Sequence, residues 1–215
     1  MKKLPPRAEN LRRALAQEAA RVMAEHGIRD FLFAKRKAAE RFGVVDGAVL
    51  PRNTEIEQAL QEYQRLFGGE AHLESLQAQR EVALEVMRRL HEFQPRLVGP
   101  VLQGTATSHD DVMLHVFADR AETVTFRLLD QRVPFEVAER RTRLDAERVV
   151  QQPAIRLEVD GQPVELVVFA LDGIRQSPIS PVDGKPMRRA DVREVEALLE
   201  SAYSSTDPDA PLPYG

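Results

Sequence analysis

Cysteine is absent from this 215-residue sequence, which excludes disulfides, thiol chemistry and metal sites built on thiolate ligands. No apolar run approaches the roughly 20 residues that a membrane-spanning helix needs. The basic N-terminus, Met1-Lys2-Lys3-Leu4-Pro5-Pro6, lacks the apolar stretch of a signal peptide. We therefore expect a cytoplasmic protein with no membrane partner.

A strong charge of one sign is also missing, because the net charge is only −4. Residues 1–93 carry 16 Lys and Arg against 14 Asp and Glu, which gives +2, and residues 94–215 carry 14 against 20, which gives −6. Neither half has the basic surface of a dedicated nucleic-acid-binding protein. Composition gives a polyanionic partner no support, although it leaves one open.

Hydrophobic residues make up 43% of the chain and charged residues 30%, as is usual for a folded globular protein. The length suits one large domain or two small ones. We predict an α+β fold with a helical region over residues 1–93, a mixed sheet with flanking helices over residues 94–203, and a mobile tail over residues 204–215. The tail contains three Pro and has no apolar periodicity.

Apolar residues at helical spacing predict two helices near the N-terminus. The first ends at Gly27, and Asp30 is expected to cap a second that runs through Phe42 to Gly43. The residues expected to face inward are Leu11, Leu15, Ala19, Val22, Ala34 and Ala38.

Two further helices are expected before residue 94. Thr54-Glu55-Ile56-Glu57 has the form of a capping box, in which the Thr hydroxyl and the second Glu carboxylate accept from unpaired backbone N–H groups. Gly68-Gly69 ends the helix that this box opens, and the next helix covers about Ala71 to Phe93. The residues expected inward are Ile56, Leu60, Tyr63, Phe67, Leu73, Leu76, Ala83, Met87 and Leu90.

After Pro95 the pattern changes to short apolar and β-rich runs. They predict strands at Arg96–Leu102, Val112–Ala118, Phe135–Thr142, Ala154–Val159 and Val164–Leu171. Asp160-Gly161 indicates a hairpin between the last two strands. Helices are expected at about Ala121–Arg132 and Ala190–Ser201, with a Pro-containing loop over Ser177–Met187.

The most informative stretch runs from Leu97 to Val116 and reads LVGPVLQGTATSHDDVMLHV. We expect a strand to end at Gly104-Thr105, followed by a polar loop with Thr107 and Ser108. A Gly-Thr turn lets backbone N–H groups and hydroxyls approach a phosphate. The acids that follow stand at the mouth of the next strand, where carboxylates could hold a Mg²⁺ that bridges the phosphate.

This layout resembles the nucleotidyltransferase superfamily, whose signature is an apolar strand, Gly-Gly or Gly-Ser, a spacer, and Asp-x-Asp or Asp-x-Glu on the next strand. Gly104-Thr105 stands at the Gly-Ser position, Asp111 matches the first acid, and Glu165 stands on a later strand where the family has its third acid. The resemblance implies a nucleoside triphosphate partner, a Mg²⁺ cofactor, Asp111 and Glu165 as catalytic and metal-binding residues, and nucleotidyl transfer to an acceptor that the sequence does not identify.

The sequence departs from that signature in three places. Met113 occupies the position of the second acid, Thr105 replaces Ser, and the spacer Ala106–Asp110 is shorter than usual. Alternation along a strand points Asp111, Met113 and His115 to one face. His115 or Asp110 could then replace the missing metal ligand.

Basic residues farther along the chain could bind a triphosphate. Arg140, with Arg141 and Arg143 beside it, lies on a predicted strand, and Lys185 lies in the Pro-containing loop ahead of Arg188-Arg189. Such residues are also common as solvated surface charges.

Two alternatives stay open. Loss of the acid at Met113 favours a catalytically inactive nucleotidyltransferase fold that acts as a nucleotide sensor or a protein-interaction module. The segment from Ala19 to Val44 instead resembles the first helices of a helix-turn-helix regulator of the TetR type, in which Lys35-Arg36-Lys37 would contact DNA phosphates. A packed helical region with one solvated basic face explains the same residues.

Overall fold

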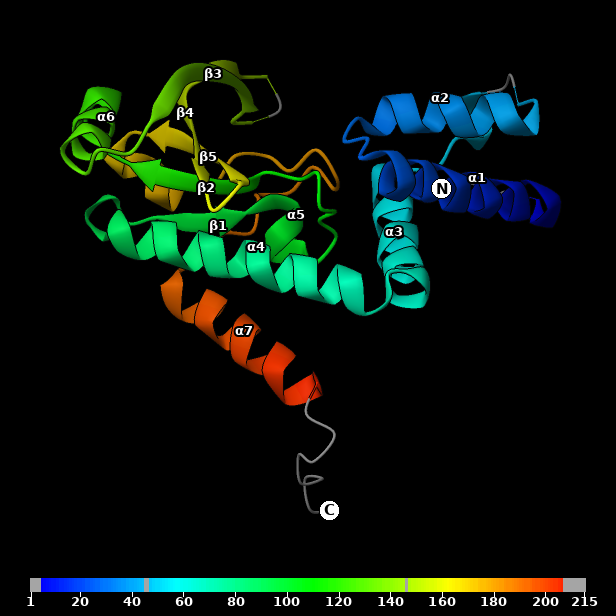
Figure 1. Cartoon of the computed structure of the whole chain (residues 1–215). Helices are drawn as coiled ribbons and strands as arrows, with labels where there is room; N and C mark the ends of the chain where they lie inside the picture. The colour runs from blue at the N-terminus through cyan, green and yellow to red at the C-terminus, as the bar shows by residue number, and fades with distance from the viewer. Residues whose placement is uncertain (1–4, 45–46, 146, 207–215) are drawn as a thin grey trace, which may run out of the picture. The chain divides into compact units, whose positions relative to one another are not determined.

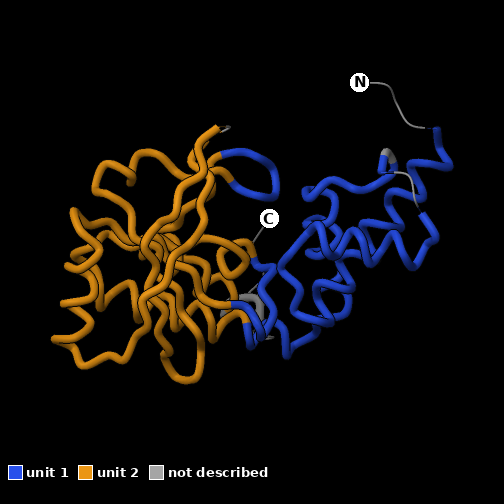
Figure 2. The backbone as a smooth tube through the Cα atoms, turned by 90° about the horizontal axis from the view of Figure 1, so that it is seen from above, with its two compact units in different colours: residues 1–75, 104–110, 180–185 blue, residues 76–103, 111–179, 186–215 orange. Residues whose placement is uncertain are grey.

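The computed structural model describes residues 5–44, 47–145 and 147–206 (Figure 1). They form an α+β protein, with helices in the N-terminal half and a mixed five-stranded sheet flanked by helices after it, as predicted. The chain divides into two compact units (Figure 2). The helical unit contains residues 1–75, 104–110 and 180–185, and the sheet unit contains residues 76–103, 111–179 and 186–215.

Helix α1 (Pro6–His26) ends where the local signals predict. Helix α2 (Phe31–Phe42) both begins and ends where they predict. Gly27 and Gly43 follow them in the left-handed conformation, with φ of 61° and 64°. The carboxylate of Asp30 accepts from the backbone N–H groups of Leu32 and Phe33, which confirms the cap of α2.

The start of α3 (Asn53–Phe67) differs from the predicted capping box. The helix begins before Thr54, so Glu55 is its third residue, and its carboxylate accepts from the backbone N–H of Arg52 at 2.6 Å. The prediction placed this role on Thr54 and Glu57. Because Glu55 takes it, the side chain of Glu57 is left for another contact.

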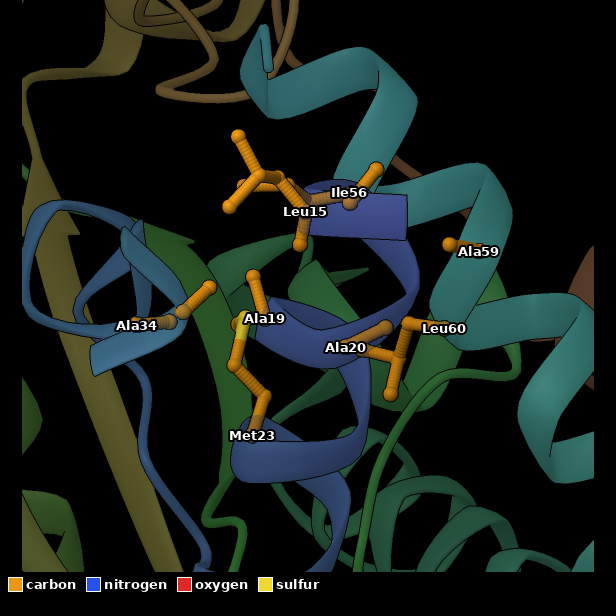
Figure 3. Packing of buried hydrophobic residues seen from close by; sticks show 10 residues of the cluster. Leu15, Ala19, Ala20, Met23, Ala34, Ile56, Ala59 and Leu60 are labelled. Carbon is orange, nitrogen blue, oxygen red and sulfur yellow. The ribbon is translucent and has the colours of Figure 1, made fainter. Parts of the chain in front are cut away.

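Alanine dominates the core of the helical unit (Figure 3). The buried cluster consists of Leu15, Ala16, Ala19, Ala20, Met23, Ala34, Ala38, Ile56, Ala59 and Leu60. Small side chains let α1 pack closely against both α2 and α3, since little volume separates the backbones. The prediction is wrong for two residues expected in the core, because Phe67 is 70% exposed and Leu73 is 57% exposed. On α3, Gln64 is buried instead.

Helix α4 (Gly69–Arg89) follows α3 with only Gly68 between them, and a 3₁₀ turn, η2 (His91–Phe93), continues it. The boundary between the compact units falls within α4, after Ser75, whereas the predicted domain boundary lies after Phe93. The buried face of α4 belongs mainly to the sheet unit, through Leu76, Val82, Ala83, Leu84, Val86 and Met87.

Five strands form one sheet in the order β1-β2-β5-β4-β3. They are β1 (Arg96–Val98), β2 (Val112–Phe117), β3 (Phe135–Arg143), β4 (Val149–Val159) and β5 (Gln162–Phe169). Strand β2 pairs with β5 in parallel, and the other neighbouring pairs are antiparallel. Asp160-Gly161 joins β4 to β5 as a hairpin, with positive φ at both residues (51° and 79°), as a type I′ turn requires.

The predicted strand Arg96–Leu102 is wrong in its second half. Strand β1 ends at Val98, and Gly99 turns the chain with a φ of 72° into the short helix α5 (Gly99–Gln103). Apolar runs of this length suit either a strand or a buried helical turn, and the turn at Gly99 decides for the helix. Gly104-Thr105 therefore follows a helix and not a strand.

The two faces of the sheet differ in chemistry. Val112, Leu114 and Val116 on β2 share one face with Val164, Leu166 and Val168 on β5, and all are at most 3% exposed. The opposite face, here called the charged face, carries Arg96, Met113, His115, Glu136, Arg140, Arg156 and Glu165. The strand register decides this division, because directly paired residues point to the same face.

Helices α4 and α7 (Val192–Thr206) lie on the same side of the sheet (Figure 1). An ion pair of 2.7 Å between Arg88 and Glu196 joins them. Helix α6 (Ala121–Asp130) connects β2 to β3, and the 3₁₀ turn η3 (Leu171–Arg175) follows β5. Helix α7 reaches Thr206, beyond the predicted end at Ser201, and the rest of the predicted tail, residues 207–215, lies outside the described residues.

None of the helices in the described part of the chain combines the length and the apolar character that crossing a membrane requires.

Candidate functional site: an arginine–glutamate cluster on the sheet

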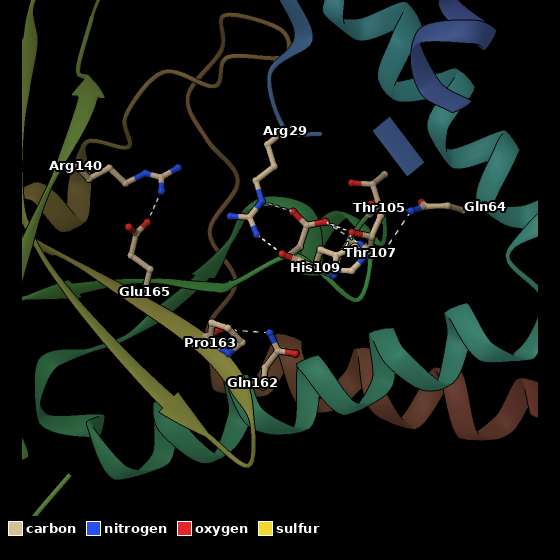
Figure 4. A network of polar contacts seen from close by, with 11 residues as sticks. Arg29, Gln64, Thr105, Thr107, His109, Arg140, Gln162, Pro163 and Glu165 are labelled. Atoms are coloured by element: carbon tan, nitrogen blue, oxygen red, sulfur yellow. Dashed lines mark hydrogen bonds and ion pairs between the residues drawn. The ribbon is translucent and has the colours of Figure 1, made fainter. Parts of the chain in front are cut away.

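Glu165 lies at the centre of the charged face. It is 2% exposed, and its carboxylate accepts from the guanidinium of Arg140 and, at 3.4 Å, from Nε and Nη2 of Arg156 (Figure 4 shows the Arg140 contact). The side chains of Arg140 and Arg156 are 39% and 59% exposed. A buried carboxylate requires such partners, because an unpaired charge at this depth is strongly unfavourable.

Met113 is the direct neighbour of Glu165 across the parallel β2–β5 pair. The two side chains therefore share the charged face, in the positions that the resemblance assigns to the second and third acids. Where a second carboxylate would stand, the sheet has a thioether, and the charge of Glu165 is compensated by arginine.

A second group on this face contains His115 and Arg189. Nε of Arg189 donates to Nδ1 of His115 at 3.0 Å, so the imidazole carries its proton on Nε2. Burial lowers the pKa of His115 well below its ordinary value, and the positive charges of Arg189 and Arg140 lower it further. His115 is therefore neutral at pH 7.

Arg189 is held by carbonyls and rings. Its Nη1 donates to the carbonyls of Gly173 and Ile174 at 2.8 and 3.3 Å, and its guanidinium carbon lies 5.0 and 5.3 Å from the ring centroids of Phe117 and Phe169. Burial lowers the pKa of Arg189 to about 10, with a contribution from the charge of Arg96. It is still protonated at neutral pH, so it adds a further guanidinium to the charged face.

The loop predicted to bind phosphate belongs to the helical unit, where its donors are engaged within the unit. The hydroxyl of Thr105 donates to Glu57 at 3.2 Å, and the N–H and hydroxyl of Thr107 both donate to Asp110 at 2.8 Å. Gly104 follows α5, and Ser108 is exposed. These contacts engage the hydroxyls of Thr105 and Thr107 within the helical unit.

Asp110, a predicted metal ligand, instead holds this turn together. Besides the two bonds from Thr107, its carboxylate pairs with Nε of Arg29 at 3.1 Å, and Arg29 also donates to the carbonyl of His109 (Figure 4). Glycine is favoured at position 27 nearby, because a Cβ there would lie 3.1 Å from the His109 side chain and its φ of 61° disfavours other residues.

Two residues that the sequence analysis missed anchor the same turn to α3. The amide of Gln64 donates to the carbonyl of Thr105 at 2.8 Å, and Glu57 accepts from the Thr105 hydroxyl. Burial raises the pKa of Glu57; the Thr105 hydrogen bond lowers it, and the charge of Asp110 raises it again. No local sequence signal predicts these contacts, because they join segments far apart in the chain.

Lys185 and Asp111 occupy different units. Lys185 is exposed in the helical unit, and its backbone N–H donates to Asp183 in the Pro-containing loop. Asp111 is half-buried in the sheet unit, directly before β2. Arg141 on β3 points away from the charged face, because it alternates with Arg140.

The residues of the charged face do not fit the metal site that the resemblance implies. Among the described residues, no group of three or more His, Asp and Glu side chains is arranged to hold a metal ion. Glu165 is paired with two arginines, and Met113 supplies no oxygen. The hard oxygen ligands that Mg²⁺ prefers are therefore not gathered here.

Arg156, also missed, could have been found from the sequence. A two-residue turn at Asp160-Gly161 pairs Val159 with Gln162, and counting back along both strands pairs Arg156 with Glu165. The predicted hairpin thus already contained the partner of the predicted acid.

Fold and site together define an α+β protein whose mixed sheet carries a carboxylate–arginine cluster on one face. In comparisons with known proteins, no family model matches the chain and no curated protein matches it.

The N-terminal helices have a geometry that bears on the DNA-binding hypothesis. Arg36 and Lys37 are exposed on α2, whereas burial lowers the pKa of the half-buried Lys35. The segment between α2 and α3 runs from Gly43 to Arg52, which is longer than the tight turn of a helix-turn-helix pair.

Proposed function

We propose that the sheet unit is a nucleotidyltransferase-like domain that binds a nucleoside triphosphate through arginines of its charged face and acts as a nucleotide sensor. The observation that carries this proposal is the position of Glu165. It lies beside Met113 across the parallel pair, with Arg140 and Arg156 around it. Guanidinium groups bind phosphate oxygens through paired hydrogen bonds, so an arginine cluster suits a polyphosphate ligand.

The turn after β1 also supports the proposal. Gly99 follows β1 directly, in a left-handed conformation. Gly99-Pro100, and not Gly104-Thr105, then corresponds to the glycine that follows the first strand in the nucleotidyltransferase signature. With this correspondence the spacer before Asp111 consists of residues 101–110. Its length is then no longer a departure from that signature.

We prefer a sensor role over nucleotidyl transfer because the set of acidic residues that the signature requires is incomplete. Met113 cannot bind a cation as a carboxylate does, and Glu165 already compensates two arginines. Binding and discrimination of a nucleotide need only the guanidinium groups and a shaped surface, whereas transfer needs stabilisation of the charge that develops on the reacting phosphate.

Calorimetric titration with ATP, GTP, CTP and UTP tests the proposal. We expect at least one nucleotide to bind, and Arg156→Gln to weaken that binding at least about tenfold, since charge-assisted contacts to phosphate are lost. Arg141→Gln is the matched control, because Arg141 is also an exposed strand arginine but points away from the charged face. Absence of binding to all four nucleotides would overturn the proposal.

Nucleotidyl transfer is a second candidate, favoured by Asp111. This half-buried acid immediately precedes β2 and stands two residues before Met113, as the first acid of the signature should. The test is release of pyrophosphate from each nucleoside triphosphate with Mg²⁺ present, in wild type and Asp111→Asn. Release that disappears in the variant would establish transfer, and its absence in the wild type would leave the sensor role alone.

A further inference from the structure

The charged face has an uneven distribution of charge and exposure. Its central acid, Glu165, is 2% exposed, whereas the arginines that it binds are 39% and 59% exposed. Each guanidinium has five N–H donors, and Glu165 uses only one donor of Arg140 and two of Arg156. Donors on the exposed side of both arginines therefore face solvent.

Arg156 is also loosely bound. Both of its contacts to Glu165 measure 3.4 Å, whereas charge-assisted bonds of this kind usually span about 2.7–2.9 Å. Because Arg156 is 59% exposed, its side chain can change partner without a change in the strand that carries it.

Carboxylates and phosphates present the same pattern to a guanidinium, namely two oxygens that accept parallel hydrogen bonds. From this equivalence, and resting on the proposed function, we propose that the carboxylate of Glu165 occupies the place of a phosphate group in the free protein. A polyphosphate free of metal displaces this carboxylate from Arg156 and shares Arg140 with it. No covalent bond changes; the ligand and Glu165 compete for the same donors.

Two consequences follow from this competition. First, Glu165 opposes binding, because an incoming anion must approach a carboxylate as well as the arginines. Second, Mg²⁺ weakens binding, because it neutralises ligand charge that Arg140, Arg156 and Arg189 would otherwise attract. At a site that uses a metal to bind the same phosphates, the Glu165 carboxylate and Mg²⁺ would both strengthen binding.

The experiment uses inorganic tripolyphosphate and the full chain, measured by calorimetry with and without Mg²⁺. We expect Glu165→Gln to bind tripolyphosphate about tenfold more tightly than wild type, because the competing charge is removed while the shape is kept. Mg²⁺ should reduce the affinity of both proteins for tripolyphosphate. Arg156→Gln should bind tripolyphosphate still more weakly. Equal or weaker binding by Glu165→Gln, or tighter binding with Mg²⁺, would overturn the inference.

A second measurement avoids any change at the buried Glu165. The Nε–H resonance of Arg156, assigned by its disappearance in Arg156→Gln, should shift saturably when tripolyphosphate is added to wild type. An unchanged resonance at saturating ligand contradicts the exchange of partners, even where Glu165→Gln fails to fold.

ATP titrated beside tripolyphosphate separates the possible sources of the phosphate chain. Equal affinities mean that the phosphates alone are recognised, and tighter binding of ATP means that the nucleoside contributes.

The two proposals fail in different ways. If wild type binds nucleotides but Glu165→Gln binds no more tightly, the proposed function stands and the competition falls. If neither protein binds nucleotides or tripolyphosphate, both fall.

Discussion

The helical unit and the sheet unit bury polar side chains for different purposes. In the helical unit the core is largely alanine; apart from Ser180, its buried polar residues among those described are Gln64, Thr105 and Asp110, which all serve one turn, residues 104–110. Each of them contacts a backbone group, a hydroxyl or a single charged partner. Their contacts account for the shape of the turn and for its attachment to α3.

In the sheet unit the core consists mainly of Val, Leu, Ile and Phe; apart from Gln79 on α4, its buried polar residues among those described are His115 and Glu165 on the charged face. Both interact with arginines that are partly exposed, so the charge reaches the surface. A polar group that is buried and satisfied from within stabilises a fold, whereas one whose partners face solvent can also respond to a ligand. This difference makes the sheet unit the better candidate for a ligand-binding site.

The largest effect should come from the alanine-rich core. Leu15 is fully buried among small residues that cannot fill the space it would leave. We expect Leu15→Ala to lower the free energy of unfolding by about 2–5 kcal/mol in urea denaturation. The half-buried Leu11 on the same helix is the control, and Leu11→Ala should cost clearly less. Equal losses would mean that this core is loosely packed.

The second effect tests the cluster on the charged face. Arg140→Met leaves Glu165 buried with only the long contacts to Arg156, so we expect a loss on the order of 2 kcal/mol in unfolding free energy. Adding Glu165→Gln to this variant should restore most of the stability, because no buried charge is then undercompensated. Failure of the second change to rescue the first would show that Arg140 acts mainly by packing.

The third effect is a dependence of stability on pH. His115 has a depressed pKa in the folded state, so below its unfolded pKa of about 6.5 the unfolded chain binds more protons. Stability from this group is present above pH 6.5 and is lost as pH falls, by at most about 1.4 kcal/mol per pH unit. His115→Gln should lose less stability than wild type between pH 7.5 and 5.5, whereas His91→Gln, at an exposed histidine, should follow wild type.

The smallest effect belongs to the helical unit. Burial raises the pKa of Glu57 above its usual value of 4.5, so the folded state holds the proton more tightly and ionisation opposes folding as pH rises. Glu57→Gln keeps an acceptor for Thr105 and should raise the unfolding free energy at pH 7 by less than about 1 kcal/mol. The difference between variant and wild type should shrink toward pH 4; a constant difference would assign the gain to another cause.

Local signals in the sequence were sufficient for much of the helical unit. Gly27, Asp30 and Gly43 mark the ends of α1 and α2 through backbone geometry and capping, which depend on a few neighbouring residues. The position of α3 was harder, because Glu55 and Glu57 both suit a cap, and only the start of the helix at Asn53 decides between them.

The candidate site was partly accessible to sequence reasoning. Glu165 was singled out because the resemblance places a third acid on this strand, and the hairpin at Asp160-Gly161 would have identified its partner Arg156. The strand predicted to end at Gly104-Thr105 ends early, at Val98, because the chain turns at Gly99 into α5. The pair of Arg29 with Asp110 could not be predicted, since no pattern in the sequence relates two residues so far apart in the chain.

The hairpin at Asp160-Gly161 also has a kinetic consequence. Its two-residue turn brings β4 and β5 together by a local closure, of the kind that takes about 1–10 μs. Strand β2 reaches β5 only after α6, β3 and β4 have been bridged, and pairings across such separations form slowly. We therefore expect the neighbourhood of Met113 and Glu165 to be completed late in folding, so that a ligand bound there slows unfolding and leaves the refolding rate nearly unchanged.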